Sequence, residues 1–181
     1  MAKVVFKIHM SVDGFVGAPD GDIGGLMVHR DEEARDWQLE LVRGAGVHVM
    51  GRVLYDHMAG FWPSSTDPFA APMNEIPKVV FSATLSDPGW GPVRVDSGPL
   101  GAGIARLRRE NEKPVLVHGG AALARSLSAA GLIDEYHLLV HPVALGAGLP
   151  IFAERTGLDL LECRRFPSGV VLLSYRREGD V

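Results

Sequence analysis

Two short stretches, Val47-His48-Val49-Met50-Gly51-Arg52 and Val115-Leu116-Val117-His118-Gly119-Gly120, have the same form. In each, an apolar run typical of a buried strand leads directly into glycine, and residues with helical spacing follow. Glycine has no Cβ, so a ligand can approach the backbone closely there. The first N–H groups of a helix have no intrahelical partner and attract an anion. Two such junctions on neighbouring strands predict a site that holds a pyrophosphate between them.

Arg52 stands in the first turn of the helix after the first junction, where its guanidinium could pair with a further phosphate. The alternative interpretation is that the glycines only permit tight turns between strand and helix. The usual nucleotide fingerprints are missing: Gly-Ala-Gly triplets begin at Gly44, Gly101 and Gly146, but none has the third glycine of the Rossmann motif, and no Walker A sequence occurs. A nucleotide would therefore be bound without these fingerprints.

The pattern around the junctions alternates strands with helices early and gives continuous strands late. The predicted strands are Val4–Met10, Val47–Met50, Lys78–Ser82, Val93–Val95, Pro114–His118, Glu135–Pro142, Leu158–Phe166 and Val170–Arg177, and the predicted helices are Asp31–Val42, one from Gly51, Leu100–Asn111 and Ala121–Ala130. The proline-rich stretch Phe61–Ile76 is expected to be an irregular loop. This order predicts an α/β fold of three layers, α-β-α, with a mostly parallel mixed sheet and an antiparallel C-terminal edge. A ligand is expected at the carboxyl ends of the parallel strands.

The composition fits one domain spanning residues 1–181, because 46% of the residues are hydrophobic and the chain contains no linker. The formal net charge of −4 argues against nucleic-acid or membrane-surface binding, which needs a clustered excess of Lys and Arg. No apolar run is long enough to span a membrane, and the N-terminus lacks the features of a signal peptide. With a single cysteine, Cys163, a cytoplasmic protein is the expectation.

Metal and nucleophile chemistry receive little support from the sequence. His137 and His141 are four residues apart on a predicted strand, which places them roughly 13 Å apart, too far to share an ion. No metal is therefore expected. A Gly-x-Ser-x-Gly elbow is also missing. The carboxylates available for acid–base work are Asp13 in the first loop and Asp31 or Asp36 on the first helix.

Six motifs in order carry a resemblance to a known family. They are Met10-Ser-Val-Asp-Gly-Phe, Met50-Gly-Arg-Val-Leu-Tyr, Lys78-Val-Val-Phe-Ser-Ala-Thr-Leu, Val117-His-Gly-Gly-Ala-Ala-Leu, Gly131-Leu-Ile-Asp-Glu-Tyr and Pro142-Val-Ala-Leu-Gly-Ala-Gly-Leu-Pro-Ile-Phe. Over about residues 3–177 they resemble the bacterial dihydrofolate reductase-like family. The closer resemblance is to the branch that includes the C-terminal reductase domain of the riboflavin-biosynthesis deaminase–reductase.

The resemblance implies a dihydrofolate reductase-like fold and an NADPH site. Its residues would be Gly51 and Arg52 at the phosphates, Ser82, Ala83 and Thr84 at the adenosine side, Gly119, Gly120, Ala121 and Ala122 at the pyrophosphate and nicotinamide side, and His9, Met10 and Val16 around the nicotinamide. Asp13 would lie in a mobile loop, and Asp36 is the nearest match to a catalytic carboxylate on the first helix. The implied reaction is hydride transfer to a carbonyl or imine carbon of a small pteridine-like or ribosylaminopyrimidine-like molecule, such as 5-amino-6-(5-phosphoribosylamino)uracil.

Two other functions fit the same residues. One is a non-catalytic nucleotide-binding protein, and the other is a hydrolase or transferase that acts on a phosphorylated metabolite at the same helix N-termini. The family also implies a homodimer paired through the C-terminal strands. The run Glu135–Phe152 is apolar enough for such a contact, although burial in the core explains it equally well.

Overall fold

The computed structural model describes residues 1–27 and 31–179, and within them one sheet of eight strands organises the fold. The order of strands across the sheet is β4-β3-β2-β5-β1-β6-β8-β7. Their bounds are β1 Val4–Ser11, β2 Val47–Gly51, β3 Lys78–Phe81, β4 Val93–Asp96, β5 Val115–His118, β6 Glu135–His141, β7 Leu158–Arg165 and β8 Val171–Arg177. Neighbouring strands from β4 to β6 are parallel, whereas β8 is antiparallel to both β6 and β7. The prediction of a mostly parallel sheet with an antiparallel C-terminal edge is confirmed.

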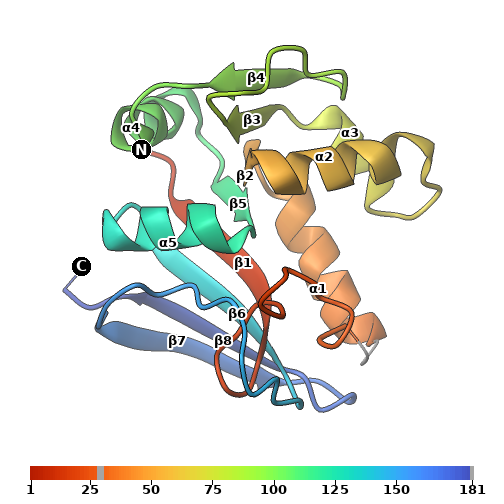
Figure 1. Ribbon diagram of the computed structural model, residues 1–181, viewed down its shortest axis with the longest axis vertical. Helices are drawn as coiled ribbons and strands as arrows, with labels where there is room; N and C mark the ends of the chain where they lie inside the picture. The colour runs from red at the N-terminus through yellow and green to blue at the C-terminus, as the bar shows by residue number, and fades with distance from the viewer. Residues whose placement is uncertain (28–30, 180–181) are drawn as a thin grey trace.

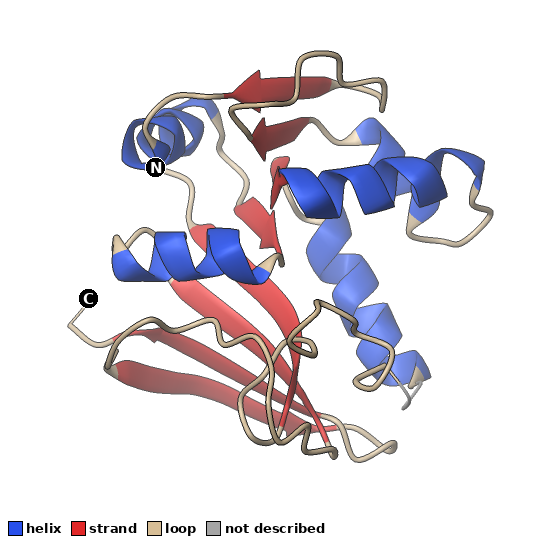
Figure 2. Cartoon of the chain, in the orientation of Figure 1, coloured by secondary structure: helices blue, strands red, loops and turns tan. Residues whose placement is uncertain are grey.

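Helices cover both faces of this sheet (Figures 1 and 2). They are α1 Glu32–Arg43, α2 Arg52–Phe61, α3 Ala70–Glu75, α4 Leu100–Glu110 and α5 Ala121–Ala129, with a short 3₁₀ helix at Trp62–Ser64. In Figure 1, α5 crosses in front of the strands and α1 lies behind them. The predicted three-layer arrangement follows from the way these helices bury their apolar sides against the two faces.

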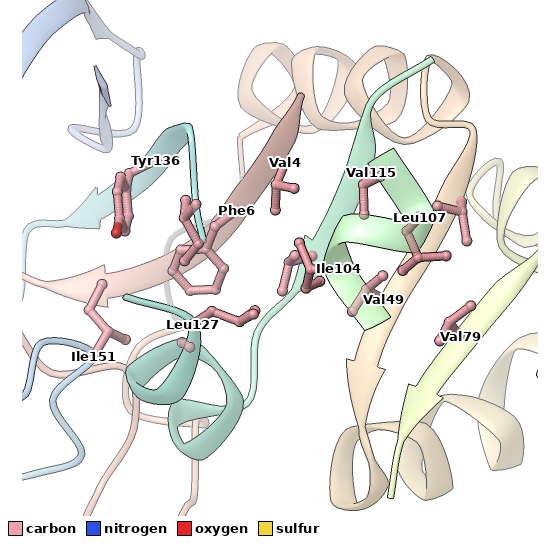
Figure 3. Packing of buried hydrophobic residues seen from close by; sticks show 14 of the residues in the cluster. Val4, Phe6, Val49, Val79, Ile104, Leu107, Val115, Leu127, Tyr136 and Ile151 are labelled. Carbon is pink, nitrogen blue, oxygen red and sulfur yellow. The ribbon is translucent and has the colours of Figure 1, made fainter. Parts of the chain in front are cut away.

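Successive side chains of β1 point to opposite faces of the sheet, so its apolar residues belong to two separate core clusters. Phe6 and its neighbours pack with Ile104 of α4 and Leu127 of α5 on one face (Figure 3). Val5 packs on the other face, in a cluster that includes Val42 of α1 and Trp90. Because side chains alternate along a strand, the α1 side of β1 also carries residues 7 and 9, which are polar.

The stretch Phe61–Ile76 differs from its predicted irregular loop, because it contains the 3₁₀ helix and α3. Pro63 lies at the start of the 3₁₀ helix and Pro72 lies in the first turn of α3, where a missing N–H breaks no intrahelical bond. The buried ammonium of Lys78 donates to the carbonyls of Met73 (2.9 Å), Asn74 (3.1 Å) and Ile76 (3.0 Å), which satisfies the end of α3.

Candidate functional site

The two glycine junctions lie side by side at the carboxyl edge of the sheet. β2 and β5 are adjacent and parallel, with Val49 paired to Val117. Gly51 ends β2 and is followed at once by α2, whereas Gly119 and Gly120 separate β5 from α5. Neither helix has a side chain that caps its N-terminus, so backbone N–H groups of both helices are available to a ligand.

Gly51 has no structural reason to be glycine. Its φ of −86° suits any residue, and a Cβ built there would meet only the Cβ of Leu123, at an ordinary 3.8 Å. Gly120 is different, because its φ of +103° is strained for a residue with a side chain. A Cβ at Gly119 would collide with Ile8. The tight-turn interpretation therefore explains the second junction but not Gly51.

The remaining predicted phosphate-side residues gather at the same edge. Arg52 is partly exposed at the start of α2, and its Nε donates to Asp56 Oδ2 at 2.7 Å. The Ser82–Thr84 turn follows β3, whose Phe81 pairs with Gly51, so this turn lies beside the first junction. The hydroxyl of Ser82 accepts from the backbone N–H groups of Thr84 and Leu85. Ala121 and Ala122 form the first turn of α5.

The three residues predicted around a nicotinamide are divided between the faces of the sheet. Met10 and Val16 are buried in the cluster beneath α4 and α5. His9 points to the opposite face, where it meets α1. His9 is therefore the one of these three side chains that reaches the space between β1 and α1.

A hydrogen-bonded row of polar side chains fills this space between β1 and α1. Lys7 Nζ donates to Gln38 Oε1 at 3.0 Å, and His9 Nε2 lies 2.8 Å from the same oxygen. His9 Nδ1 lies 2.8 Å from His141 Nε2 of β6. Burial lowers the pKa of Lys7 to about 8 and holds the pKa of His9 well below its usual range. We call Lys7, His9, Gln38 and His141 the polar row.

A second histidine pair lies beside the polar row. His118 pairs with Lys7 in the register of β5 and β1, and its Nε2 is 2.9 Å from His48 Nδ1. His48 Nε2 lies 3.3 Å from the carbonyl oxygen of Pro72, which can only accept, so His48 donates there and accepts from His118. Burial lowers the pKa of His48 to about 4 and that of His118 well below its usual range, so both rings are neutral at pH 7.

The carboxylates predicted for catalysis lie outside this space. Asp36 is exposed on α1, roughly 200° around the helix from Gln38. Among the described residues, the α1 side chain that is hydrogen-bonded to β1 is Gln38, and a catalytic role for Asp36 stays a prediction that its exposed position does not favour. Asp31 caps α1 by accepting from Ala34 N at 3.0 Å.

Asp13 connects two loops. Its carboxylate accepts from the N–H groups of Leu145 (3.1 Å) and Gly146 (2.7 Å). Hydrogen bonds from the Ser11 side chain and from these N–H groups lower the pKa of Asp13, so it is ionised at neutral pH and ill-suited to donate a proton.

Lys7, Gln38 and His141 were missed as site residues by the sequence interpretation. A signal for Lys7 was present, since Lys7 and His9 alternate with Phe6, Ile8 and Met10 in a strand that is otherwise apolar. Within residues 1–27 and 31–179, no group of three or more His, Cys, Asp or Glu side chains could hold a metal ion. His137 instead pairs with the hydroxyl of Ser174 at 2.8 Å. None of the helices described is long and apolar enough to cross a membrane.

Comparisons with known proteins agree with this architecture. The uncharacterized protein YyaP of Bacillus subtilis (strain 168) is 26% identical over 187 residues, covering 98% of this chain and 96% of YyaP. The deaminase/5-amino-6-(5-phosphoribosylamino)uracil reductase of Thermotoga maritima superposes with a TM-score of 0.70 at 16% identity, covering 97% of this chain and 56% of that protein. A dihydrofolate reductase from Enterococcus faecalis, complexed with NADP(H), superposes with a TM-score of 0.67 at 11% identity over 97% of this chain and 96% of that one.

The last two likenesses show the fold, which is that of the dihydrofolate reductases. The family model of the RibD C-terminal domain matches residues 2–97 and 100–172, which is nearly the whole chain. The chain therefore belongs to the RibD C-terminal domain family.

Proposed function

We propose that this protein is an NADPH-dependent reductase that transfers hydride to a carbonyl or imine carbon of a small substrate. The observation that carries the proposal is the pair of adjacent junctions, and above all Gly51, whose missing Cβ serves no purpose in the fold. Membership of a family of reductases supports the same activity. When bound, the reduced nicotinamide supplies the hydride, and the protein supplies position and charge.

The residues at the sheet edge suit a dinucleotide phosphate. The free N–H groups at the starts of α2 and α5 would hold the pyrophosphate. Arg52 would leave Asp56 and pair with the 2′-phosphate, and the Ser82–Thr84 turn would border the adenosine.

The polar row supplies a proton donor for the substrate. Reduction of a carbonyl adds a hydride to carbon and a proton to oxygen, and Lys7 Nζ is the group that we assign to donate that proton. Its pKa of about 8 allows the transfer at neutral pH, after which solvent restores the proton to the amine. A ribosylaminopyrimidine-like substrate is favoured over a pteridine-like one, because the polar row offers an ammonium group and no carboxylic acid to protonate a ring nitrogen.

Cofactor binding is tested by fluorescence titration with NADPH, NADH and inorganic phosphate. Arg52→Ala should weaken NADPH binding by about 10- to 100-fold and NADH binding far less, since one charged hydrogen-bonded pair to phosphate is lost. Arg109→Ala, an exposed arginine on α4, is the matched control and should change neither. Equal affinity of Arg52→Ala and wild type for NADPH would remove the main support for this cofactor.

Turnover is tested by following NADPH oxidation with 5-amino-6-(5-phosphoribosylamino)uracil and with dihydrofolate. The first compound should be reduced, and its rate should decline as pH rises through about 8, where Lys7 loses its proton. If NADPH binds tightly but neither compound is reduced, the non-catalytic nucleotide-binding function is the better description.

A further inference from the structure

We infer that Gln38 is a positioning residue for Lys7, and that the His9–His141 pair holds Gln38 in the orientation that this role requires. The catalytic purpose of this arrangement rests on the proposed reductase function. The hydrogen bonds that define it lie within the chain. Gln38 is 31 residues from Lys7 in sequence, and it is the α1 side chain that accepts a hydrogen bond from Lys7.

The amide of Gln38 has a defined orientation. Its Nε2 donates to the carbonyl of Ala34 one turn earlier at 3.1 Å, so Oε1 is the atom that faces β1. That oxygen has two acceptor sites, and Lys7 at 3.0 Å and His9 at 2.8 Å fill both. Lys7 is thereby fixed by a neutral acceptor, which leaves the remaining N–H groups of its ammonium for a substrate oxygen.

The histidine pair determines where the protons lie. An amide oxygen cannot donate, so His9 must carry its proton on Nε2. A neutral His9 ring then accepts at Nδ1, and His141 donates to it from Nε2 at 2.8 Å. The N–H groups therefore point in one direction, from His141 through His9 to Gln38.

In the part of the chain that the structure describes, the titratable side chains next to Lys7 in the sheet are histidines, and beyond them Glu135 Oε2 lies 3.7 Å from His137 Nε2. The histidines are His9 on the same strand as Lys7, His118 of β5 and His137 of β6, the last two being register partners of Lys7. Burial lowers the pKa of all three, so they are neutral at pH 7. Among the described residues, no carboxylate is hydrogen-bonded to Lys7. A carboxylate at position 38 would hold the proton on Lys7, whereas the amide allows Lys7 to release it.

The decisive variant is Gln38→Glu, which keeps the shape of the side chain and adds a charge. The chain has four lysines, so ¹³C-lysine NMR can follow each one with pH, and Lys7→Arg assigns the Lys7 resonance. In wild type Lys7 should titrate near pH 8, and in Gln38→Glu its midpoint should rise by about 1 to 3 pH units. The alkaline limit of turnover should move by the same amount.

The matched control is Asp36→Asn, which changes the charge of the exposed side of the same helix and should leave the Lys7 midpoint within about 0.3 units. If Gln38→Glu does not fold, Gln38→Met removes the acceptor and should lower the midpoint instead. A Lys7 midpoint that is the same in wild type and in the folded variant overturns the inference. Because the titration needs neither NADPH nor substrate, its failure is distinct from failure of the reductase function.

Discussion

At the scale of single residues, the glycines of this chain divide by what a Cβ would meet. At Gly103 a Cβ would collide with the ring of Phe81, and at Gly148 with the backbone oxygen of Gly17. Both belong to Gly-Ala-Gly triplets, and at these two positions the missing Cβ permits close packing inside the fold. Gly51 has room for a side chain and ordinary backbone angles, so packing within the chain does not require glycine there, and the proposed phosphate contact would.

This contrast predicts opposite results for two substitutions. Gly51→Ala should leave the melting temperature unchanged within error but weaken NADPH binding by at least about tenfold, because the methyl group occupies space that a phosphate would use. Gly120→Ala should lower the free energy of unfolding by about 1–2 kcal/mol, because alanine is strained at a φ of +103°.

Thermal melts and fluorescence titration on the two purified variants measure these effects. A Gly51→Ala protein that binds NADPH as tightly as wild type would mean that no ligand passes close to this backbone.

At the scale of elements, two pairs of polar contacts connect segments that the sheet alone does not fix. The His118–His48–Pro72 chain joins β5 to β2 and then to α3. Asp13 joins the loop after β1 to the loop after β6, and the bridge between Phe15 and Pro150 reinforces that contact.

The histidine chain should make the protein sensitive to acid. The pKa of His48 is about 4 in the folded state, against 6.5 for an ordinary histidine, so the unfolded chain binds more protons between these values. Stability is therefore complete above about pH 6.5 and falls as pH decreases toward 4. His48 alone should cost about 2 kcal/mol of unfolding free energy at pH 5, and His118 acts in the same direction.

Urea denaturation at pH 7.5 and pH 5 measures this loss. His48→Gln keeps a donor for Pro72 and an acceptor for His118, and it should lose about 2 kcal/mol less than wild type between the two pH values. His57→Gln, at an exposed histidine on α2, should behave as wild type. Equal losses in His48→Gln and wild type would show that the buried pair does not control acid stability.

The Asp13 contact should control local opening rather than global stability. Asp13→Ala removes the acceptor for the N–H groups of Leu145 and Gly146, so hydrogen exchange at these two amides should accelerate by about tenfold. Asp20→Ala, which changes another exposed aspartate of the same loop region, should leave them unaffected. Unchanged exchange in Asp13→Ala would mean that the loops are held by other contacts.

At the scale of the whole molecule, the sequence predicts those features that depend on the local pattern of apolar residues and glycines. The eight strands, four of the helices and the two junctions follow from apolar periodicity and from glycine positions. The polar row does not, because the Lys7–Gln38 contact depends on how α1 is rotated above β1. The family resemblance favours Asp36, two positions away, which the same rotation turns toward solvent. The proline-rich loop was also misjudged, since prolines in the first turn of a helix are permitted.

The apolar run at Glu135–Phe152 shows that an apolar pattern alone does not distinguish core burial from a contact between subunits. Leu139 and Ile151 are almost fully buried within the chain itself, so the core accounts for these members of the run, whereas Val143, Leu145 and Leu149 are only partly buried. A homodimer through the C-terminal strands stays a prediction, to be measured by light scattering on the purified protein.

The position of β1 has a consequence for biosynthesis. Its partners in the sheet begin at Val115 and Glu135, so β1 leaves the ribosome well before either neighbour has been translated. The nascent chain must carry an apolar strand with two unsatisfied edges through most of its synthesis, which exposes it to aggregation and to chaperones. Since the second junction and both histidine pairs also need these late strands, a chain interrupted before β5 would lack half of the proposed cofactor site.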